Sequence, residues 1–187
     1  MMRIVAGTFR GRRLHAPKGT EIRPTSDRVR EAIFSIIGPT VEAAKVLDLF
    51  AGTGALGLEA LSRGASEAVF IDRSLQAVQL IRSNIELCGV QDRVSIIHGS
   101  VDQGLHRLAD RGEVFDLIFM DPPYGGGSVQ KTLSNLAAVA RNRTLVVAEH
   151  GVRDLSPLYP ADRQWIKIQE RKYGDTAVSF FVREFVH

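Results

Sequence analysis

The chain has 187 residues, of which 44% are hydrophobic and 24% are charged, as in an ordinary globular protein with a substantial core. No apolar stretch approaches the roughly 20 residues that a membrane-spanning helix needs, and the N-terminus lacks the apolar core of a signal peptide. The single cysteine, Cys88, excludes an internal disulfide, so we expect a cytoplasmic protein.

Positive charge is concentrated at the start of the chain. The net charge is +3, but residues 1–30 hold eight basic and two acidic side chains, which gives this segment +6 and leaves −3 for the rest. A basic segment on a slightly acidic body predicts a surface for a polyanion such as nucleic acid. A solvated segment that contacts nothing specific is the alternative. The basic residues are Arg3, Arg10, Arg12, Arg13, Lys18, Arg23, Arg28 and Arg30.

The first elements are an arm and a helix. Turn signals recur within residues 3–23, which are expected to form a short hairpin or extended arm. A helix should follow, with Thr25 or Ser26 as its cap and Gly38 at its end. Its apolar residues recur at helical spacing and are expected to face the core, whereas Arg28 and Arg30 fall outside that face.

Strands and helices then alternate. Apolar runs predict strands at 45–50, 67–72, 93–98, 114–120 and 143–149. Helical periodicity predicts helices at 55–63, 75–88, 101–111 and 128–140. The helix at 75–88 is expected to bury Leu75, Val78, Ile81 and Ile85. Residues 164–173 and 177–186 are expected to form two further strands joined as a hairpin.

This order of elements predicts an α/β fold with a doubly wound, mostly parallel sheet and a C-terminal antiparallel hairpin. We expect a single domain over residues 1–187, in which residues 1–40 form the basic arm and helix and residues 41–187 form a Rossmann-like core.

The first predicted strand runs into a glycine-rich turn. Gly52, Gly54 and Gly57 fit the spacing G-x-G-x-x-G between a strand and a helix, as in nucleotide-binding folds. Asp72 closes the next strand, where a carboxylate can accept hydrogen bonds from ribose hydroxyls. This context predicts a nucleoside-containing cofactor, and a turn that serves only tight packing is the alternative.

The charge of Asp48 is expected to discriminate between cofactors. A carboxylate at the end of the first strand opposes a dinucleotide pyrophosphate, since like charges about 4 Å apart repel by several kcal/mol at intermediate dielectric. The same carboxylate favours S-adenosylmethionine, whose ammonium and sulfonium are positive. The residues expected to bind this cofactor are Asp48, Phe50, Ala51, Gly52, Thr53, Gly54, Asp72 and Arg73.

One more cofactor contact is expected after the strand at 93–98. Class I methyltransferases often place an acid there to accept a hydrogen bond from the adenine amino group. Here Ser100 occupies that position and Asp102 lies two residues further on. The Ser100 hydroxyl can supply the contact, the choice between Ser100 and Asp102 stays open, and an ordinary helix N-cap at Ser100 is the alternative.

Asp121-Pro122-Pro123-Tyr124 follows the strand at 114–120 and is expected to be the catalytic motif. Asp121 and the Pro122 carbonyl can accept N–H hydrogen bonds from an exocyclic amine, while Tyr124 can stack on its ring. The two acceptors would aim the nitrogen lone pair at the methyl group and stabilise the nitrogen as it becomes positive during in-line displacement. A proline-rich turn without a catalytic role is the alternative.

Other chemistries have less support in the sequence. Cys88 lies in the last turn of an amphipathic helix, which is typical of a packing residue rather than a nucleophile. The histidines form no cluster with ligand spacing, so we expect no metal site. The histidines are His15, His98, His106, His150 and His187.

Along nearly its whole length the chain resembles the RsmD-type bacterial 16S ribosomal RNA guanine-N2 methyltransferases. The more specific part of the resemblance is the arginine-rich start followed by Arg-Pro-Thr-Ser-Asp-Arg at 23–28. The Asp-Pro-Pro-Tyr motif is less specific, because DNA adenine and protein glutamine methyltransferases share it. The matching segments are 3–7, 11–14, 23–34, 48–65, 121–124 and 173–176.

The resemblance implies a class I methyltransferase that uses S-adenosylmethionine and modifies N2 of one guanine, guanine 966, in the 16S rRNA of the small ribosomal subunit. It also implies that the arm binds RNA, through Arg3, Arg10, Arg12, Arg13, Arg23, Arg28 and Arg30. We expect a monomer with no membrane partner.

Three other functions remain open at this point. DNA adenine-N6 methylation uses the same pocket, but residues 1–44 are the only appended element and no target-recognition domain is evident. An rRNA-binding assembly factor without turnover is disfavoured by the intact Asp48, Asp72 and Asp121. A nicotinamide-dependent oxidoreductase is disfavoured by Asp48.

Overall fold

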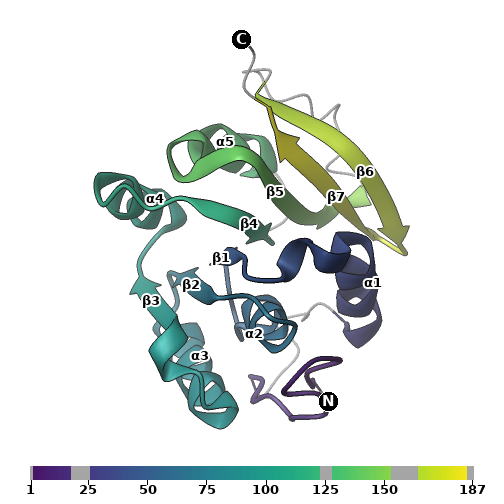
Figure 1. Ribbon diagram of the computed structural model, residues 1–187, viewed down its shortest axis with the longest axis vertical. Helices are drawn as coiled ribbons and strands as arrows, with labels where there is room; N and C mark the ends of the chain where they lie inside the picture. The colour runs from purple at the N-terminus through teal and green to yellow at the C-terminus, as the bar shows by residue number, and fades with distance from the viewer. Residues whose placement is uncertain (1, 18–25, 123–127, 153–163, 185–187) are drawn as a thin grey trace.

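The structure is a computed structural model, which describes residues 2–17, 26–122, 128–152 and 164–184. In these residues a seven-stranded sheet has the strand order β3-β2-β1-β4-β5-β7-β6 (Figure 1). The strands are β1 Lys45–Leu49, β2 Glu67–Asp72, β3 Val94–His98, β4 Phe115–Met120, β5 Ala140–Gly151, β6 Trp165–Tyr173 and β7 Thr176–Arg183. The helices are α1 Asp27–Ile37, α2 Ala55–Ser62, α3 Leu75–Cys88, α4 Val101–Asp110 and α5 Ser128–Asn135, with 3-10 turns η1 Gly38–Val41, η2 Gln91–Arg93 and η3 Leu136–Val139.

The predicted sheet is confirmed. Strands β1 to β5 pair in parallel, and β7 pairs antiparallel with both β5 and β6. From β1 the chain adds β2 and β3 on one side and then β4 and β5 on the other, so the strand order reverses between β1 and β4. Folds of this kind bind ligands at this reversal, beyond the carboxyl ends of the strands.

The region around residue 140 differs from the sequence-based expectation. The predicted helix at 128–140 divides into α5 and η3, and β5 begins at Ala140 rather than at residue 143. A β-bulge in the pairing of β4 with β5 explains why β5 begins early. Ala140 pairs with Phe115, whereas Leu145, five residues further on, pairs with Leu117, only two residues further along β4. Within this bulge Arg143 has a φ of 67°, a conformation that hydrophobic periodicity does not reveal.

Hydrophobic residues cover both faces of the sheet. One cluster lies between one face of the sheet and the helices α1, α2 and α3, and it includes Phe70 and Phe119. The other joins the opposite face to α4 and α5, and it includes Ile71 and Ile118. Successive strand residues thus enter opposite clusters, as expected when helices cover both faces of a sheet (Figure 1).

The N-terminal segment, residues 2–17, is folded onto the body of the molecule. Arg3 pairs with Arg13 in an isolated bridge, and the turn between them closes with a hydrogen bond from Ile4 N to Arg12 O of 2.9 Å. Apolar side chains of the segment, among them Ile4 and Leu14, are buried in the same cluster as α1 and α2. The predicted hairpin is therefore confirmed for these residues, but it is packed rather than extended.

Candidate active site

The glycine turn follows β1 and has a strained backbone. Phe50, Gly52 and Gly54 all have positive φ values, of 57°, 57° and 75°. Such a φ is uncommon for a residue with a side chain, and it persists at Phe50 because the turn is held by its neighbours. Ala51 N donates to Ile71 O at 3.1 Å, which ties the turn to the end of β2.

The glycines of the turn have different physical roles. A Cβ at Gly57 would lie 2.4 Å from the Phe70 ring, so this glycine permits α2 to pack on β2. A Cβ at Gly52 would meet only Phe50 O, at 3.9 Å, so the space beside Gly52 is open. Gly52 is therefore the position at which a ligand can approach the backbone.

Asp72 holds the turn from the end of β2. One carboxylate oxygen accepts from Gly52 N at 2.8 Å, and the other accepts from Ser74 N at 2.8 Å. Each oxygen keeps a further lone pair, so the half-buried carboxylate can still accept from hydroxyl groups. This geometry fits the predicted binding of a ribose.

Asp48 is enclosed beneath the turn. It is 3% exposed and accepts from Gly57 N at 2.9 Å. Burial raises the pKa of Asp48 to about 8, and the neighbouring Asp121 and Asp72 add to the rise. A positively charged cofactor would favour the charged form of this carboxyl group, so the expectation that Asp48 selects the cofactor stays a prediction. Its observed role is to hold the start of α2.

Asp121 follows β4 and lies near the other carboxyl groups. Its side chain is half-buried, and burial together with the charge of Glu149 raises its pKa to about 7. Glu149 is buried near the end of β5, directly beside β4 in the sheet, and it is not among the site residues predicted from the sequence. The available signal was its position at the end of a strand parallel to the Asp121 strand. Pro122 is buried, whereas Pro123 and Tyr124 lie outside the described residues.

Ser100 is a helix cap in this structure. Its hydroxyl accepts from Gln103 N at 3.2 Å, and the Gln103 side chain accepts from Ser100 N, which completes a capping box at the start of α4. Asp102 instead pairs with Lys131 of α5 at 3.1 Å and accepts from Asn135. The alternative interpretation of Ser100 as an N-cap is confirmed, and its contact with a cofactor stays a prediction.

Two residues near Asp72 face solvent. Arg73 is exposed, and its carbonyl oxygen lies 3.2 Å from a ring nitrogen of His98. Leu75 is 58% exposed, so the expectation that it joins the buried face of its helix is wrong. Leu75 is the first residue of α3, and the buried residues of this helix begin at Ala77.

The N-terminal arginines divide into exposed and buried ones. Arg30 is fully buried, pairs with Asp27 at 2.9 Å and donates to Arg3 O. Its predicted contact with RNA is therefore wrong, because its guanidinium serves the interior of the fold. Arg23 lies outside the described residues. The exposed arginines are Arg3, Arg10, Arg12, Arg13 and Arg28.

A polar cleft of about 250 Å³ lies among these exposed arginines. It is lined by both basic and acidic side chains, and Arg3 pairs there with Asp27 at 3.3 Å. The lining residues are Arg3, Ile4, Val5, Arg10, Gly11, Asp27 and Glu31.

Cys88 is buried, and burial raises the pKa of its thiol, as expected for a packing residue. Within the described ranges, no group of three or more His, Cys, Asp or Glu side chains is placed to hold a metal ion. In the same described residues, no helix has the length and apolar character to cross a membrane.

The strand order, the glycine turn after β1 and the acid at the end of β2 define a Rossmann-like class I methyltransferase, the class that uses S-adenosylmethionine. Residues 2–182 match the family model described as "Conserved hypothetical protein 95". The chain belongs to this family, that of the RsmD-type methyltransferases.

Similar proteins cover nearly the whole chain. The "Putative rRNA methyltransferase YlbH" of Bacillus subtilis (strain 168) is 36% identical over 96% of this chain and 98% of its own length. The "Ribosomal RNA small subunit methyltransferase D" of Escherichia coli (strain K12) is 36% identical over 98% of this chain and 90% of its own length. The solved structure of "Putative methyltransferase yhhF from Escherichia coli" has a TM-score of 0.85 at 34% identity and covers 98% of both chains.

Proposed function

We propose that this protein transfers a methyl group from S-adenosylmethionine to the exocyclic N2 of a guanine in 16S rRNA, the position equivalent to guanine 966. The observation that carries the proposal is the position of Asp121, which directly follows Met120 of β4, and Met120 pairs with Leu49 at the end of β1, just before the glycine turn. A cofactor held by the turn and an amine held by Asp121 would therefore meet. The names of the relatives from B. subtilis and E. coli support rRNA as the substrate.

The cofactor is proposed to lie against the glycine turn. When bound, S-adenosylmethionine supplies an electrophilic methyl group on a sulfonium. Asp72 accepts hydrogen bonds from the ribose hydroxyls, and the open side of Gly52 admits the methionine moiety near the N-terminus of α2. The exposed Leu75 offers an apolar surface next to Asp72 on which the adenine can pack.

The guanine amine is proposed to bind at the Asp-Pro-Pro-Tyr motif. Asp121 and the Pro122 carbonyl accept its two N–H groups, which orients the nitrogen lone pair toward the methyl group. The nitrogen lone pair forms the C–N bond as the S–C bond breaks, and the S–C electron pair leaves with S-adenosylhomocysteine. The nitrogen gains positive charge until its surplus proton is lost to water, so the carboxylate of Asp121 stabilises the transition state more than the ground state. Tyr124 is assigned the stacking contact with the base, worth about 1–3 kcal/mol.

The RNA is proposed to bind along the N-terminal segment and the start of α1. Arg3, Arg10, Arg12, Arg13 and Arg28 present exposed guanidinium groups there for phosphates. Arg23 belongs to the same sequence motif and is included in the proposal. The proposed substrate is the small ribosomal subunit or its rRNA, and we propose that one cytoplasmic chain acts alone as a single methyltransferase domain.

The decisive experiment is transfer of labelled methyl to 16S rRNA, naked and in small-subunit particles, followed by nucleoside analysis. We expect N2-methylguanosine, and we expect Asp121→Asn to lower kcat by about 100- to 1,000-fold while the affinity for S-adenosylhomocysteine changes little. Asp116→Asn is the matched control, because Asp116 lies on the same strand but pairs with Arg141 and accepts from Lys45 N.

Each other outcome contradicts a separate part of the proposal. N6-methyladenosine in a DNA substrate would select the adenine methyltransferase alternative. Binding of rRNA without any methylated product would select the assembly factor. Unchanged turnover in Asp121→Asn would remove the amine site from β4.

A further inference from the structure

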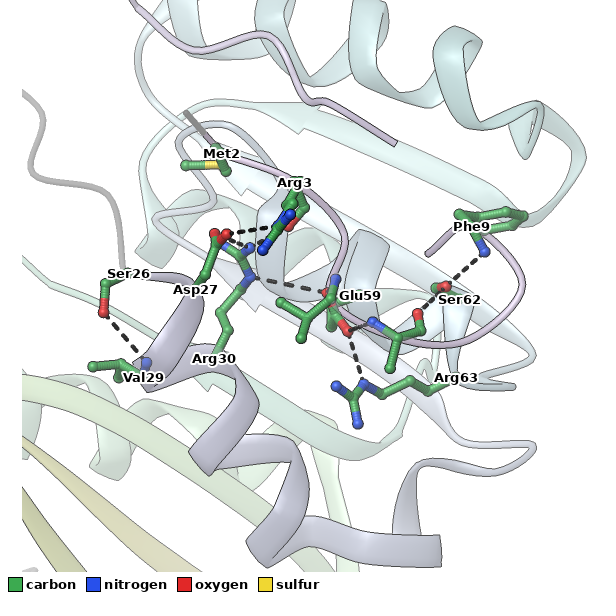
Figure 2. Close-up of polar contacts among 12 residues, drawn as sticks. Met2, Arg3, Phe9, Ser26, Asp27, Val29, Arg30, Glu59, Ser62 and Arg63 are labelled. Atoms are coloured by element: carbon green, nitrogen blue, oxygen red, sulfur yellow. Dashed lines mark hydrogen bonds and ion pairs between the residues drawn. The ribbon is translucent and has the colours of Figure 1, made fainter. Parts of the chain in front are cut away.

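The N-terminal segment is fastened to α2, the helix that follows the glycine turn, by the carboxylate of Glu59. This carboxylate is fully buried and accepts from Val5 N at 2.8 Å and from Ala6 N at 2.9 Å. Figure 2 shows Arg30 and Arg63 approaching the same group, with Arg63 Nε 2.8 Å from it. A buried carboxylate with these partners fixes the segment to α2.

Ser62 adds a second attachment one turn further along α2. Its hydroxyl accepts from Phe9 N at 2.9 Å and donates to Ala6 O at 2.6 Å (Figure 2). Gly7 passes so close that a Cβ there would lie 1.9 Å from Ser62 O. Because the backbones of the segment and α2 are in direct contact here, with no room for a side chain between them, we expect the segment to be either fully docked on α2 or fully detached from it.

Asn84 of α3 connects the far end of the segment to the glycine turn. Its side chain is fully buried, and its amide oxygen accepts from His15 N at 2.7 Å. Its amide nitrogen donates to His15 O at 3.0 Å and to Thr53 O at 2.9 Å. One side chain thus joins the segment to the residue between Gly52 and Gly54.

The turn itself contacts the start of the segment. The Thr53 hydroxyl, which is buried, donates to Met2 Sδ at 3.3 Å. Thr53 is therefore held from both ends of the segment, by Met2 directly and by His15 through Asn84. The turn has three residues with positive φ, so its conformation depends on such partners.

We propose that Asn84 is a positioning residue that couples RNA binding on the N-terminal segment to cofactor binding on the glycine turn; the RNA half of this inference rests on the proposed function. Undocking the segment would deprive the buried Thr53 hydroxyl of Met2 Sδ and the buried Asn84 amide of His15, so the docked segment stabilises the turn. RNA that binds the docked segment then tightens cofactor binding. By thermodynamic linkage, the cofactor tightens RNA binding by the same factor.

The test measures the dissociation constant of S-adenosylhomocysteine by calorimetry, with and without a saturating hairpin fragment of 16S rRNA. For the wild-type protein we expect the RNA to tighten binding by about 10-fold, within the usual range of such couplings. For Asn84→Ala we expect binding without RNA to weaken by about 10-fold and the RNA effect to disappear, because the Thr53 carbonyl is deprived of its donor.

Ile85→Ala is the matched control. Ile85 is the next residue of α3 and is 5% exposed, so its truncation lowers stability through poorer packing alone. It should keep the full RNA effect on S-adenosylhomocysteine binding. A control that loses the RNA effect as fully as Asn84→Ala would overturn the proposal, since general destabilisation would then explain both.

A second variant tests the same link from the segment side. His15 has an exposed side chain, and His15→Pro removes its backbone donor to Asn84 without making a buried cavity. We expect it to reduce the RNA effect while the fold is retained. Should Asn84→Ala fail to fold, this variant decides the question alone, and an unchanged RNA effect in it overturns the proposal.

The outcomes also separate this inference from the proposed function. If the wild-type protein methylates the RNA but the RNA does not change S-adenosylhomocysteine affinity, the coupling is wrong and the function stands. If the wild-type protein neither binds nor methylates RNA, the function fails and the coupling fails with it. In that case the affinity of Asn84→Ala for S-adenosylhomocysteine still decides whether Asn84 positions the turn.

Discussion

Two aspartates at the ends of adjacent strands have different chemistry because their surroundings differ. Asp48 is enclosed beneath the glycine turn, and burial raises its pKa to about 8. Asp121 is only half-buried, and its pKa of about 7 reflects burial together with the negative charge of Glu149. Both carboxyl groups can therefore change their charge near physiological pH, but Asp48 is engaged by the backbone N–H of Gly57 in α2.

The pH dependence of methyl transfer tests the proposed role of Asp121. Its raised pKa means that the carboxyl group is protonated below about pH 7, and a protonated group is a weaker acceptor for the amine. We expect kcat/KM to rise about 10-fold per pH unit below pH 7 and to level off above it.

The same profile should differ between free and cofactor-bound enzyme. The positive sulfonium of bound S-adenosylmethionine favours the charged form of Asp121. The midpoint of the kcat profile, which reports the enzyme with its cofactor bound, should therefore lie at lower pH than the midpoint of the profile of kcat/KM for S-adenosylmethionine. Asp121→Asn should abolish the rise. A rise that persists in this variant would assign the titration to another group.

At the scale of elements, the unit that matters is β1, the glycine turn and α2. The turn is tied to β2 through Asp72 and Ile71, and α2 packs on Phe70 at a position where only glycine fits. The same helix carries Glu59, which holds the N-terminal segment. One short helix therefore connects the proposed cofactor site to the proposed RNA surface.

Gly57→Ala tests this packing. The added Cβ would lie 2.4 Å from the Phe70 ring and 3.2 Å from Asp48 Oδ2, so α2 must shift away from β2. We expect the free energy of unfolding, measured by urea denaturation, to fall by about 1–3 kcal/mol, together with weaker cofactor binding. Gly99→Ala is the control, because its Cβ would meet the flexible end of Gln103 and should cost little. Equal decreases in both variants would contradict the packing argument.

At the scale of the whole molecule, the basic N-terminus is part of the folded body. Residues 2–14 bury apolar side chains in the cluster that lies between the sheet and α1, α2 and α3, while their arginines face outward. Arg12 is itself structural in part, because it donates to Leu87 O and lies over the Phe9 ring at 5.3 Å. Arg10 and Arg13 are better probes of RNA binding, since replacing them leaves these interactions of Arg12 intact.

The salt dependence of RNA binding tests this surface. Replacing Arg10 and Arg13 with alanine should lower the slope of log affinity against log salt by roughly 0.7–0.9 for each phosphate that the protein no longer neutralises. Replacing Arg107 and Arg111 is the matched control, because these exposed arginines lie on or beside α4, on the opposite face of the sheet. An equal change in both pairs would indicate general electrostatics rather than a binding surface.

Much of the fold could be predicted because its signals are local. The cap at Ser26, the end of α3 at Gly89 and the hairpin at Gly174 are set by neighbouring residues, and the structure confirms them. The glycine turn and the acid at the end of β2 were also predicted from spacing alone. Leu75 and Arg30 were misplaced because periodicity does not show whether the first turn of a helix is covered by the rest of the fold, or which buried carboxylate needs a cation.

By itself the sequence determined the alternation of strands and helices, the strand ends at which polar residues gather, and the family. Only the tertiary structure decided that burial raises the pKa of Asp48, that Glu149 raises the pKa of Asp121, and that Asn84 joins the N-terminal segment to the glycine turn. The reason is physical: hydrogen bonding within an element depends on adjacent residues, whereas burial and charge depend on groups that are distant in the chain and meet only when it folds.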